Sequence, residues 1–396
     1  YEVWSPLAAT HVLDVSHQWP RKRAALACHT TALACGDYAR AMHGLAGYRS
    51  LLLPGHKTPH HYAEAYHALD YASQNPGSAS PGLQVRFALP KDGPGVATLF
   101  ARVFEARPDR SWWAWKYGGE PHPGSVARDA DGAVVGFYGA QTRQARWKGR
   151  NYSACQQGDV MVAPEHRFAT RRQGVFASIS QLFLSRRVGD GKPFALSYGF
   201  PTPRALALGR HLGLYQRGDD LHEWRAVALH DRPGLATRFT LTPATEVKDW
   251  DWVDHLTELP AGAENCLHMV RSGDYWQRRF GRHPEAPYCL LRVTRWGRLC
   301  AAAVLRQRDD TLEIVDVVLR RRRYWPHLLS AMHGAAGRLG CRTLLAWGTA
   351  QAIAAFPGGE RRGAGNLALP GSSITASLSS AVNGHCWMLG GDTDFR

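Results

Sequence analysis

The hydrophobic pattern of the chain is regular from Leu83 onward. Apolar and polar residues alternate over 83–89, which is typical of a strand, and apolar residues recur at helical spacing over 93–106. Strand-like runs within 125–164 come next, separated by Gly-containing turn signals. The remaining expected elements are a helix at 171–187, a strand at 194–200, a short helix at 203–213 and closing strands within 214–229. This order predicts an α/β (α+β) fold with a mixed sheet, not a doubly wound one.

The second half of the chain repeats this order. Similar segments are 274–287 and 111–124, 288–307 and 125–142, 312–319 and 158–164, and 342–349 and 193–200, while 251–259 takes the place of the first helix. Five consecutive similar elements indicate two tandem copies of one domain. We expect these domains at 83–227 and 228–396. Residues 1–82 end in a Gly/Pro/Ser-rich stretch typical of linkers, and they remain an unassigned N-terminal extension.

The first copy contains a basic loop that opens a helix. Residues 162–167 read VAPEHR, and 171–176 read RRQGVF. The amide N–H groups at a helix start are unpaired and the dipole is positive there, so this point can bind a pyrophosphate. Gly174 leaves room for close approach of a ligand, and Arg171 and Arg172 add charge-assisted hydrogen bonds to phosphate.

A strand followed by V-x-P-x-x-R and a basic Q-G loop resembles the core signature of the GNAT superfamily of acyl-CoA-dependent N-acyltransferases. The resemblance covers about 83–225 well and the remainder as a degenerate copy, so it implies two tandem GNAT-like domains. In GNAT proteins this loop wraps the pyrophosphate of coenzyme A, and the end of the preceding strand pairs with the pantetheine arm. The residues that the resemblance assigns to acetyl-CoA binding are Met161, Val162, Arg167, Arg171, Arg172, Gln173, Gly174, Val175 and Phe176.

Two departures from the family pattern affect the loop. Phe176 stands where GNAT proteins usually have Gly or Ala, and the extra spacing leaves either Arg167 or Arg171 in the role of the first arginine. The equivalent place in the second copy, 323–327, reads RYWPH; it has no glycine, and Pro326 removes an amide donor. We therefore expect a second domain without a coenzyme A site, which packs on the first and walls the acceptor cleft.

Acyl transfer to an amine requires a neutral nitrogen, a polarised thioester carbonyl and often a proton for the departing thiolate. Asp159 and Glu165 flank the strand that precedes the loop and are candidate bases; a salt-bridged or solvated carboxylate is the alternative for each. Tyr198 and Tyr215 are candidate acids. The place of the usual GNAT tyrosine is occupied by Gly209, so Tyr215 either substitutes for it or is a core or cleft-lining residue.

Other features have structural interpretations. The aromatic residues within 112–117 would suit stacking on a sugar, but a similar set in the second copy favours a core or a domain interface. The four arginines at 320–323 could bind nucleic acid, yet no nucleic-acid motif accompanies them, so we expect a solvated loop or the rim of an anionic-substrate site. His56, His60 and His61 lack partnered ligands, so no metal site is expected.

The formal charge of +15 admits an anionic partner or simply an arginine-rich proteome. Eight cysteines are scattered without C-x-x-C pairs, which indicates reduced thiols and a cytoplasmic protein; the start of the chain also lacks a signal-peptide pattern. The apolar runs fall far short of the roughly 20 residues that cross a bilayer, so no membrane span is expected.

The sequence thus predicts an N-acyltransferase, specifically an N-acetyltransferase, that moves acetyl from acetyl-CoA to a small amine or amino sugar. A Fem-type aminoacyl-tRNA-dependent transferase also pairs two GNAT-like halves and is one alternative. A catalytically inactive binding protein that has kept the fold is the other.

Overall fold

The computed structural model describes residues 11–28, 30, 36–53, 62–66, 83–106, 108, 111–120, 122–167, 174–229, 236–285, 287–371 and 377–393. Its contacts divide the chain into two compact units, 1–75 and 76–396. The histidine cluster at 56–61 and the loop residues Arg171, Arg172 and Gln173 lie outside the described residues.

The first unit holds a small folded piece in the segment that the sequence left unassigned. Strands β1 (His11–Asp14) and β2 (Ala63–Tyr66) pair antiparallel beside helices α1 (Trp19–Ala27) and α3 (Tyr38–Ser50). Trp19 is buried, and its ring stacks on Tyr62 at a centroid distance of 4.5 Å. An aromatic cluster therefore takes the place of a larger aliphatic core here.

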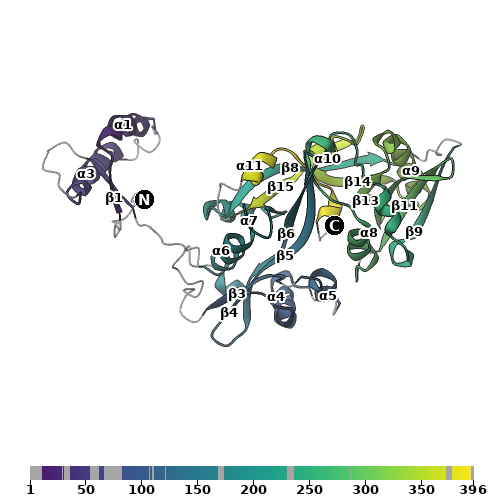
Figure 1. Cartoon of the computed structure of the whole chain (residues 1–396), viewed down its shortest axis with the longest axis horizontal. Coiled ribbons are helices and arrows are strands. Elements are labelled where there is room, and N and C mark those ends of the chain that lie inside the picture. Colours follow the sequence, from purple (N-terminus) through teal and green to yellow (C-terminus); the bar gives the residue numbers. More distant parts are fainter. Residues whose placement is uncertain are drawn as a thin grey trace. The chain divides into compact units, whose positions relative to one another are not determined.

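In the second unit the described strands form one mixed sheet (Figure 1). The elements of its first half are β3 (Gln84–Phe87), α4 (Gly93–Phe104), α5 (Trp112–Tyr117), β4 (Gly124–Arg128), β5 (Val134–Trp147), β6 (Arg150–Val162), α6 (Val175–Arg187), β7 (Leu196–Gly199), α7 (Pro203–His211) and β8 (Tyr215–Val227). Those of its second half are β9 (Thr237–Pro243), β10 (Leu267–Met269), α8 (Gly273–Trp276), β11 (Tyr288–Arg295), β12 (Arg298–Arg308), β13 (Thr311–Leu319), α9 (Trp325–Arg338), β14 (Thr343–Thr349), α10 (Ala350–Ile353), β15 (Glu360–Pro370), α11 (Ser377–Val382) and β16 (Cys386–Trp387). The expected mixed α/β fold is confirmed.

The element expected at 251–259 differs from a regular helix. The structure has a 3₁₀ helix, Asp251–His255, and Leu256 then leaves helical geometry with φ −113° and ψ 81°. Pro260 follows closely and disfavours helical geometry in the residue before it. The first helix of the second copy is therefore reduced to a short turn.

Strands from the two sequence halves are interleaved in the sheet. The order is β16-β10-β5-β6-β7-β15-β8-β14-β13-β12-β11-β9, with β3 and β4 attached beside β5. Strand β15 lies between β7 and β8, and β10 pairs with the far end of the long strand β5. The two halves therefore share one sheet. The domain boundary at 227/228 remains a prediction that rests on the sequence repeat.

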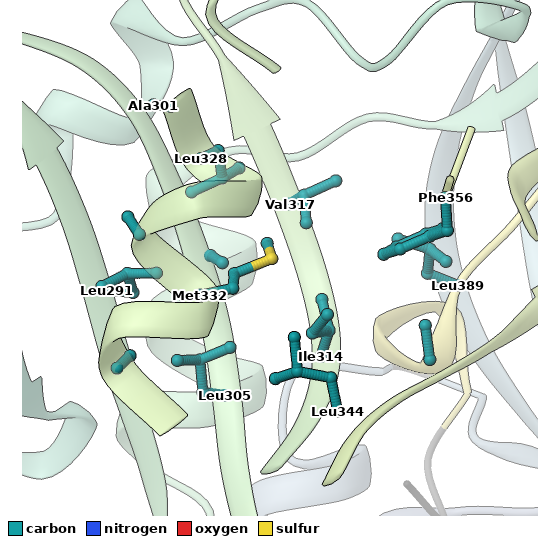
Figure 2. Packing of buried hydrophobic residues seen from close by; sticks show 14 of the residues in the cluster. Leu291, Ala301, Leu305, Ile314, Val317, Leu328, Met332, Leu344, Phe356 and Leu389 are labelled. Atoms are coloured by element: carbon teal, nitrogen blue, oxygen red, sulfur yellow. The ribbon is translucent and has the colours of Figure 1, made fainter. Parts of the chain in front are cut away.

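In each half a long helix packs on the strands, α6 in the first and α9 in the second. In the first half Ser125 donates to the carbonyl of Ile179 on α6 at 2.6 Å, and a Cβ on Gly136 would approach Val175 to 2.4 Å. Figure 2 shows the equivalent packing in the second half, where Leu328 and Met332 of α9 lie against the strands. The buried strand residues around them include Leu291, Leu305, Ile314, Val317 and Leu344.

Two pairs of parallel strands separate after a short stretch of pairing. Strands β6 and β7 are paired from Ala154–Leu196 to Gln157–Gly199, and β6 then continues alone on that side to Val162 within the described chain. Strands β13 and β14 pair only over residues 311–314 and 343–346. A parallel pair that diverges in this way leaves unpaired main-chain groups that another segment or a ligand must satisfy.

The two divergences are filled differently. Between β13 and β14 the chain's own C-terminal segment enters: Thr349 N–H donates to the carbonyl of Met388 at 3.0 Å, and Gly348 bridges Leu389. A Cβ on Gly348 would lie 2.3 Å from the Met388 oxygen, so this contact needs glycine. Between β6 and β7 there is a cavity instead.

Candidate functional site

A cavity of about 1080 Å³ opens where β6 and β7 diverge. Its walls come from the end of β6, the first turn of α6, helix α7, the α4–α5 region, and three segments of the second half, within 283–288, 306–308 and 368–370. Pockets of this kind, with apolar walls and a few placed polar groups, are the usual sites of ligand binding. We therefore take this cavity as the candidate active site.

The open edge of β6 forms one wall. Ala163 N–H donates to the carbonyl of Val135 on β5 at 2.8 Å. Because alternate residues of an antiparallel strand direct their main-chain groups to the same neighbour, Met161 also faces β5. Val160 and Val162 then direct theirs to the cavity side, and both residues line the cavity. Because the main-chain groups of Met161 face β5, the sequence assignment of strand atoms fits Val162 better than Met161.

The start of α6 forms the second polar wall. Gly174 is the buried N-cap residue of α6, with φ −66° and ψ 158°, an extended conformation that any residue can adopt. The backbone conformation therefore does not itself require glycine here. Val175, Phe176 and Ala177 line the cavity, and their first-turn N–H groups have no partner within the helix. Arg167 is exposed, and its Nε donates to the Val162 carbonyl at 2.9 Å.

A largely buried carboxylate, that of Asp159, lies at a bulge in β6 and is 9% exposed. The register of β5 and β6 shifts there, and Asp159 has φ 47°. Its Oδ2 accepts from Lys116 Nζ at 2.6 Å and from the Tyr117 hydroxyl at 2.7 Å. Lys116 and Asp159 both line the cavity. Sequence reasoning named Asp159 but missed Lys116, although a lysine inside the aromatic run WWAWKY was a signal of a buried charge partner.

Glu165 and Tyr198 lie elsewhere. Glu165 is exposed and accepts from Arg102 Nη2 at 2.8 and 3.0 Å; its own main-chain N–H and Arg102 lower its pKa. Tyr198 is fully buried, accepts from Arg143 at 3.2 Å and donates to the Asp392 carbonyl at 3.2 Å. Burial raises the pKa of the Tyr198 hydroxyl well above its usual value. Both residues are absent from the described lining of the cavity.

Tyr215 lines the cavity beside Gly209. A Cβ on Gly209 would lie 2.3 Å from Cδ2 of the Tyr215 ring, so the ring occupies the space above this helix position. Phe176 meets the same ring edge-on at 6.0 Å. Burial raises the pKa of the Tyr215 hydroxyl, which keeps it protonated at neutral pH. The tyrosine four residues beyond the helix thus fills the space above Gly209.

The second half supplies a wall that sequence reasoning expected but did not assign to residues. The indole N–H of Trp115 donates to the Arg278 carbonyl at 2.6 Å, and the ring lies 4.3 Å from that of His283. Burial together with Arg279, Arg306 and Lys116 lowers the pKa of His283 to about 3, so this imidazole is neutral. Trp112, Trp113 and Tyr117 pack in the core of the first half, and Trp112 also lines the cavity.

Other candidates occupy structural positions. Arg321 and Arg322 are exposed and pair with Glu258 and Glu264. Within the described residues no group of three His, Cys, Asp or Glu side chains is arranged to hold a metal ion, and no helix is both long and apolar enough to span a bilayer. The described cysteines are free thiols, most of them buried.

Comparisons with known proteins agree with this geometry. Residues 84–209 match the family model of the GNAT acetyltransferase domain. A probable N-acyltransferase of unknown function from Enterococcus faecalis V583 superposes with a TM-score of 0.59 at 15% identity, covering 75% of this chain and 74% of that one. A GCN5-related N-acetyltransferase from Kribbella flavida gives a TM-score of 0.53 at 17% identity, covering 72% and 70%.

A GCN5-related N-acetyltransferase from Anabaena variabilis gives a TM-score of 0.54 at 12% identity, covering 75% and 74%. A search of curated proteins found no match. At these identities the structural similarity establishes the fold, and the match to residues 84–209 establishes which half carries the family signature.

Proposed function

We propose, from the match of residues 84–209 to the GNAT acetyltransferase domain, that the protein is an acyl-CoA-dependent N-acyltransferase, and specifically that it transfers acetyl from acetyl-CoA to the amine of a small metabolite or amino sugar. The observation that carries the proposal is the cavity, which joins an unpaired strand edge to a helix N-terminus. An extended polar chain that ends in a pyrophosphate needs both of these features.

The donor would lie across the β6–α6 side of the cavity. Val160 and the N–H of Val162 would offer main-chain groups to the amides of the pantetheine arm, since the Val162 carbonyl accepts from Arg167. The N–H groups at the start of α6, reached over Gly174, would bind the pyrophosphate, with charge from Arg167 and from Arg171 and Arg172 of the basic loop.

The reaction joins the amine nitrogen to the thioester carbonyl carbon, breaks the C–S bond and moves one proton from nitrogen to sulfur. Asp159 is the proposed acceptor of the amine proton because its carboxylate lines the cavity. Lys116, 2.6 Å from that carboxylate, holds it in place. Tyr215 is the proposed donor to the thiolate, because it also lines the cavity and its hydroxyl remains protonated. The unpaired N–H groups of β6 would stabilise the oxyanion.

The scattered free thiols suit a reducing compartment, so we place the protein in the cytoplasm. Gly209, in the place of the usual GNAT tyrosine, favours the alternative of a catalytically inactive binding protein. The charge of +15 favours the aminoacyl-tRNA alternative. Both make predictions that differ from ours: no turnover of any amine in the first case, and tRNA binding without coenzyme A binding in the second.

The test is calorimetric titration of acetyl-CoA and of coenzyme A into the full chain and into Gly174→Trp, which fills the approach to α6. Gly363→Trp is the control, since Gly363 is exposed on β15 with open space around its Cβ position. We expect saturable binding that is lost in Gly174→Trp and kept in Gly363→Trp, with circular dichroism verifying that both variants are folded. A folded wild-type protein that binds neither molecule would refute the proposed function.

A further inference from the structure

The acceptor side of the cavity is a composite wall with a particular chemistry. From the first half come Phe104, whose side chain is 48% exposed although large and apolar, and Trp115. From the second half come His283, Tyr288 and the strand end at 306–308. A flat aromatic surface therefore faces a segment rich in arginine.

This wall is held in place before any acceptor arrives. Trp115 is fixed by its hydrogen bond to the Arg278 carbonyl, and His283 Nδ1 accepts from the Glu285 N–H at 3.1 Å. The Tyr288 hydroxyl accepts from Arg279 at 3.0 Å. A surface ordered in advance does not spend binding free energy on becoming ordered.

The cationic side chains on this side of the cavity differ in whether a carboxylate pairs with them. Lys116 is neutralised by Asp159, and Arg306 by Glu313 at 2.6 Å. Arg308, at the exposed end of β12, has no carboxylate partner among the described residues. Glu285 is the other carboxylate that lines this side. The wall thus presents an arginine that is free to bind an anion.

Burial is the largest cause of the lowered pKa of His283, and nearby cations add to it. The cations that oppose protonation of this imidazole are Arg279, Arg306 and Lys116. A positive field also opposes protonation of an acceptor amine, which must be neutral to attack, and it repels a polycationic acceptor.

We propose that the acceptor is an amine that carries an anionic group, a carboxylate or a phosphate, on an apolar or ring-shaped body. Arg308 binds the anionic group, and the aromatic surface of Trp115 and His283 packs against the body. This inference rests on the proposed function, because it names the substrate class of the same cavity.

The test compares matched amines in a thiol-release assay with the full chain and acetyl-CoA. The pairs are glucosamine with glucosamine 6-phosphate and tyramine with tyrosine, so that the phosphate and carboxylate sources are separated; spermidine is the polycationic probe. Each amine is also titrated into the protein saturated with coenzyme A. The variants are Arg308→Gln, Arg308→Lys and, as a matched control on the same strand, Arg298→Gln, since Arg298 is exposed at the start of β12 away from the cavity.

We expect the anionic member of at least one pair to have the higher kcat/KM. Arg308→Gln should lower that value about tenfold and leave the neutral member within about twofold, because one charge-assisted contact is lost. Arg308→Lys should restore part of it, and Arg298→Gln should behave as wild type. A preference for the neutral members or for spermidine, a preference that survives Arg308→Gln, or an absence of binding by every anionic member overturns the inference. Failure of acetyl-CoA and coenzyme A to bind overturns the proposed function instead, so the two failures are distinguishable.

Discussion

Removal of one buried charge, Asp392, tests whether the C-terminal segment holds the second unit together. The side chain is fully buried, and Asp392→Asn keeps its volume while removing its charge. Its Oδ1 accepts from Arg143 at 3.2 Å, and its Oδ2 accepts from Arg271 at 2.6 Å and from the Leu389 N–H at 3.0 Å. In the variant, Arg271 keeps its ion pair with Asp316 at 3.1 Å, whereas Arg143 loses its carboxylate and keeps hydrogen bonds to the hydroxyls of Tyr198 and Tyr275.

The expected loss can be sized from this geometry. Breaking a buried ion pair by removing one partner costs about 3–5 kcal/mol, because the remaining charge stays buried without compensation. Both arginine side chains are about 2% exposed, so solvent cannot replace the lost carboxylate. We therefore expect Asp392→Asn to lower the free energy of unfolding by about 3–5 kcal/mol.

Urea unfolding followed by tryptophan fluorescence measures this loss, because Trp387 lies 5.3 Å from the Arg271 guanidinium and Trp276 donates to Asp316 at 3.0 Å. The control is Asp310→Asn, whose partner Arg342 is 82% exposed; such a pair is worth less than about 1 kcal/mol. A loss for Asp392→Asn no larger than that of the control would show that the buried network does not hold the segment in place.

Two further predictions concern catalysis and pH. Tyr215→Phe should lower kcat by about 100-fold or more with little change in acetyl-CoA binding, as steady-state kinetics and titration would show. Tyr198→Phe should chiefly lower stability, because its hydroxyl lies in the Asp392 network. Comparable kcat values for the two variants would remove Tyr215 from the acid role. Burial opposes ionisation of Asp92, but hydrogen bonds from Arg86, Arg128 and the Leu89 N–H outweigh it and lower its pKa. A carboxylate with a lowered pKa stabilises the folded state at pH values above its unfolded-state pKa of about 3.9, and this stability is lost as the pH falls through the folded-state pKa. The difference in thermal midpoint between wild type and Asp92→Asn should therefore be large at pH 7 and shrink below about pH 4. A difference that stays constant with pH would contradict this linkage.

Local signals in the sequence predicted much of the first half. Alternation, helical spacing and Gly-containing turns gave the strand and helix order, and the RRQG loop marked the start of α6 near Gly174. These features depend on residues that are close in the sequence, so periodicity reveals them. The exchange of β10, β15 and β16 between the halves has no local signal, because it depends on which strand edges are free after folding.

The missed site residues have the same explanation. Lys116 and Asp159 meet only because α5 packs against the bulge in β6, and His283 reaches the cavity from the other half. Gly209 and Tyr215 were both noticed in the sequence, but their relation was not predictable. The structure shows that the Tyr215 ring fills the space above Gly209.

The contrast between the two diverging strand pairs explains why one half is expected to bind a ligand. Between β13 and β14, Thr349 donates its main-chain N–H to Met388 and accepts from the Met388 N–H through Oγ1 at 3.1 Å, so the polar groups are satisfied by the chain itself. Gly391 packs so closely that a Cβ would lie 2.7 Å from the Asp316 carboxyl carbon, which leaves little room there for a pantetheine arm. In the second half, the loss of the glycine and of an amide donor at Pro326, visible in the sequence, is thus accompanied by a filled gap between the strands. Strand β6 has no such main-chain neighbour beyond Gln157 on that side among the described residues, although Arg167 Nε reaches the Val162 carbonyl, and this edge is where the proposed pantetheine arm would pair.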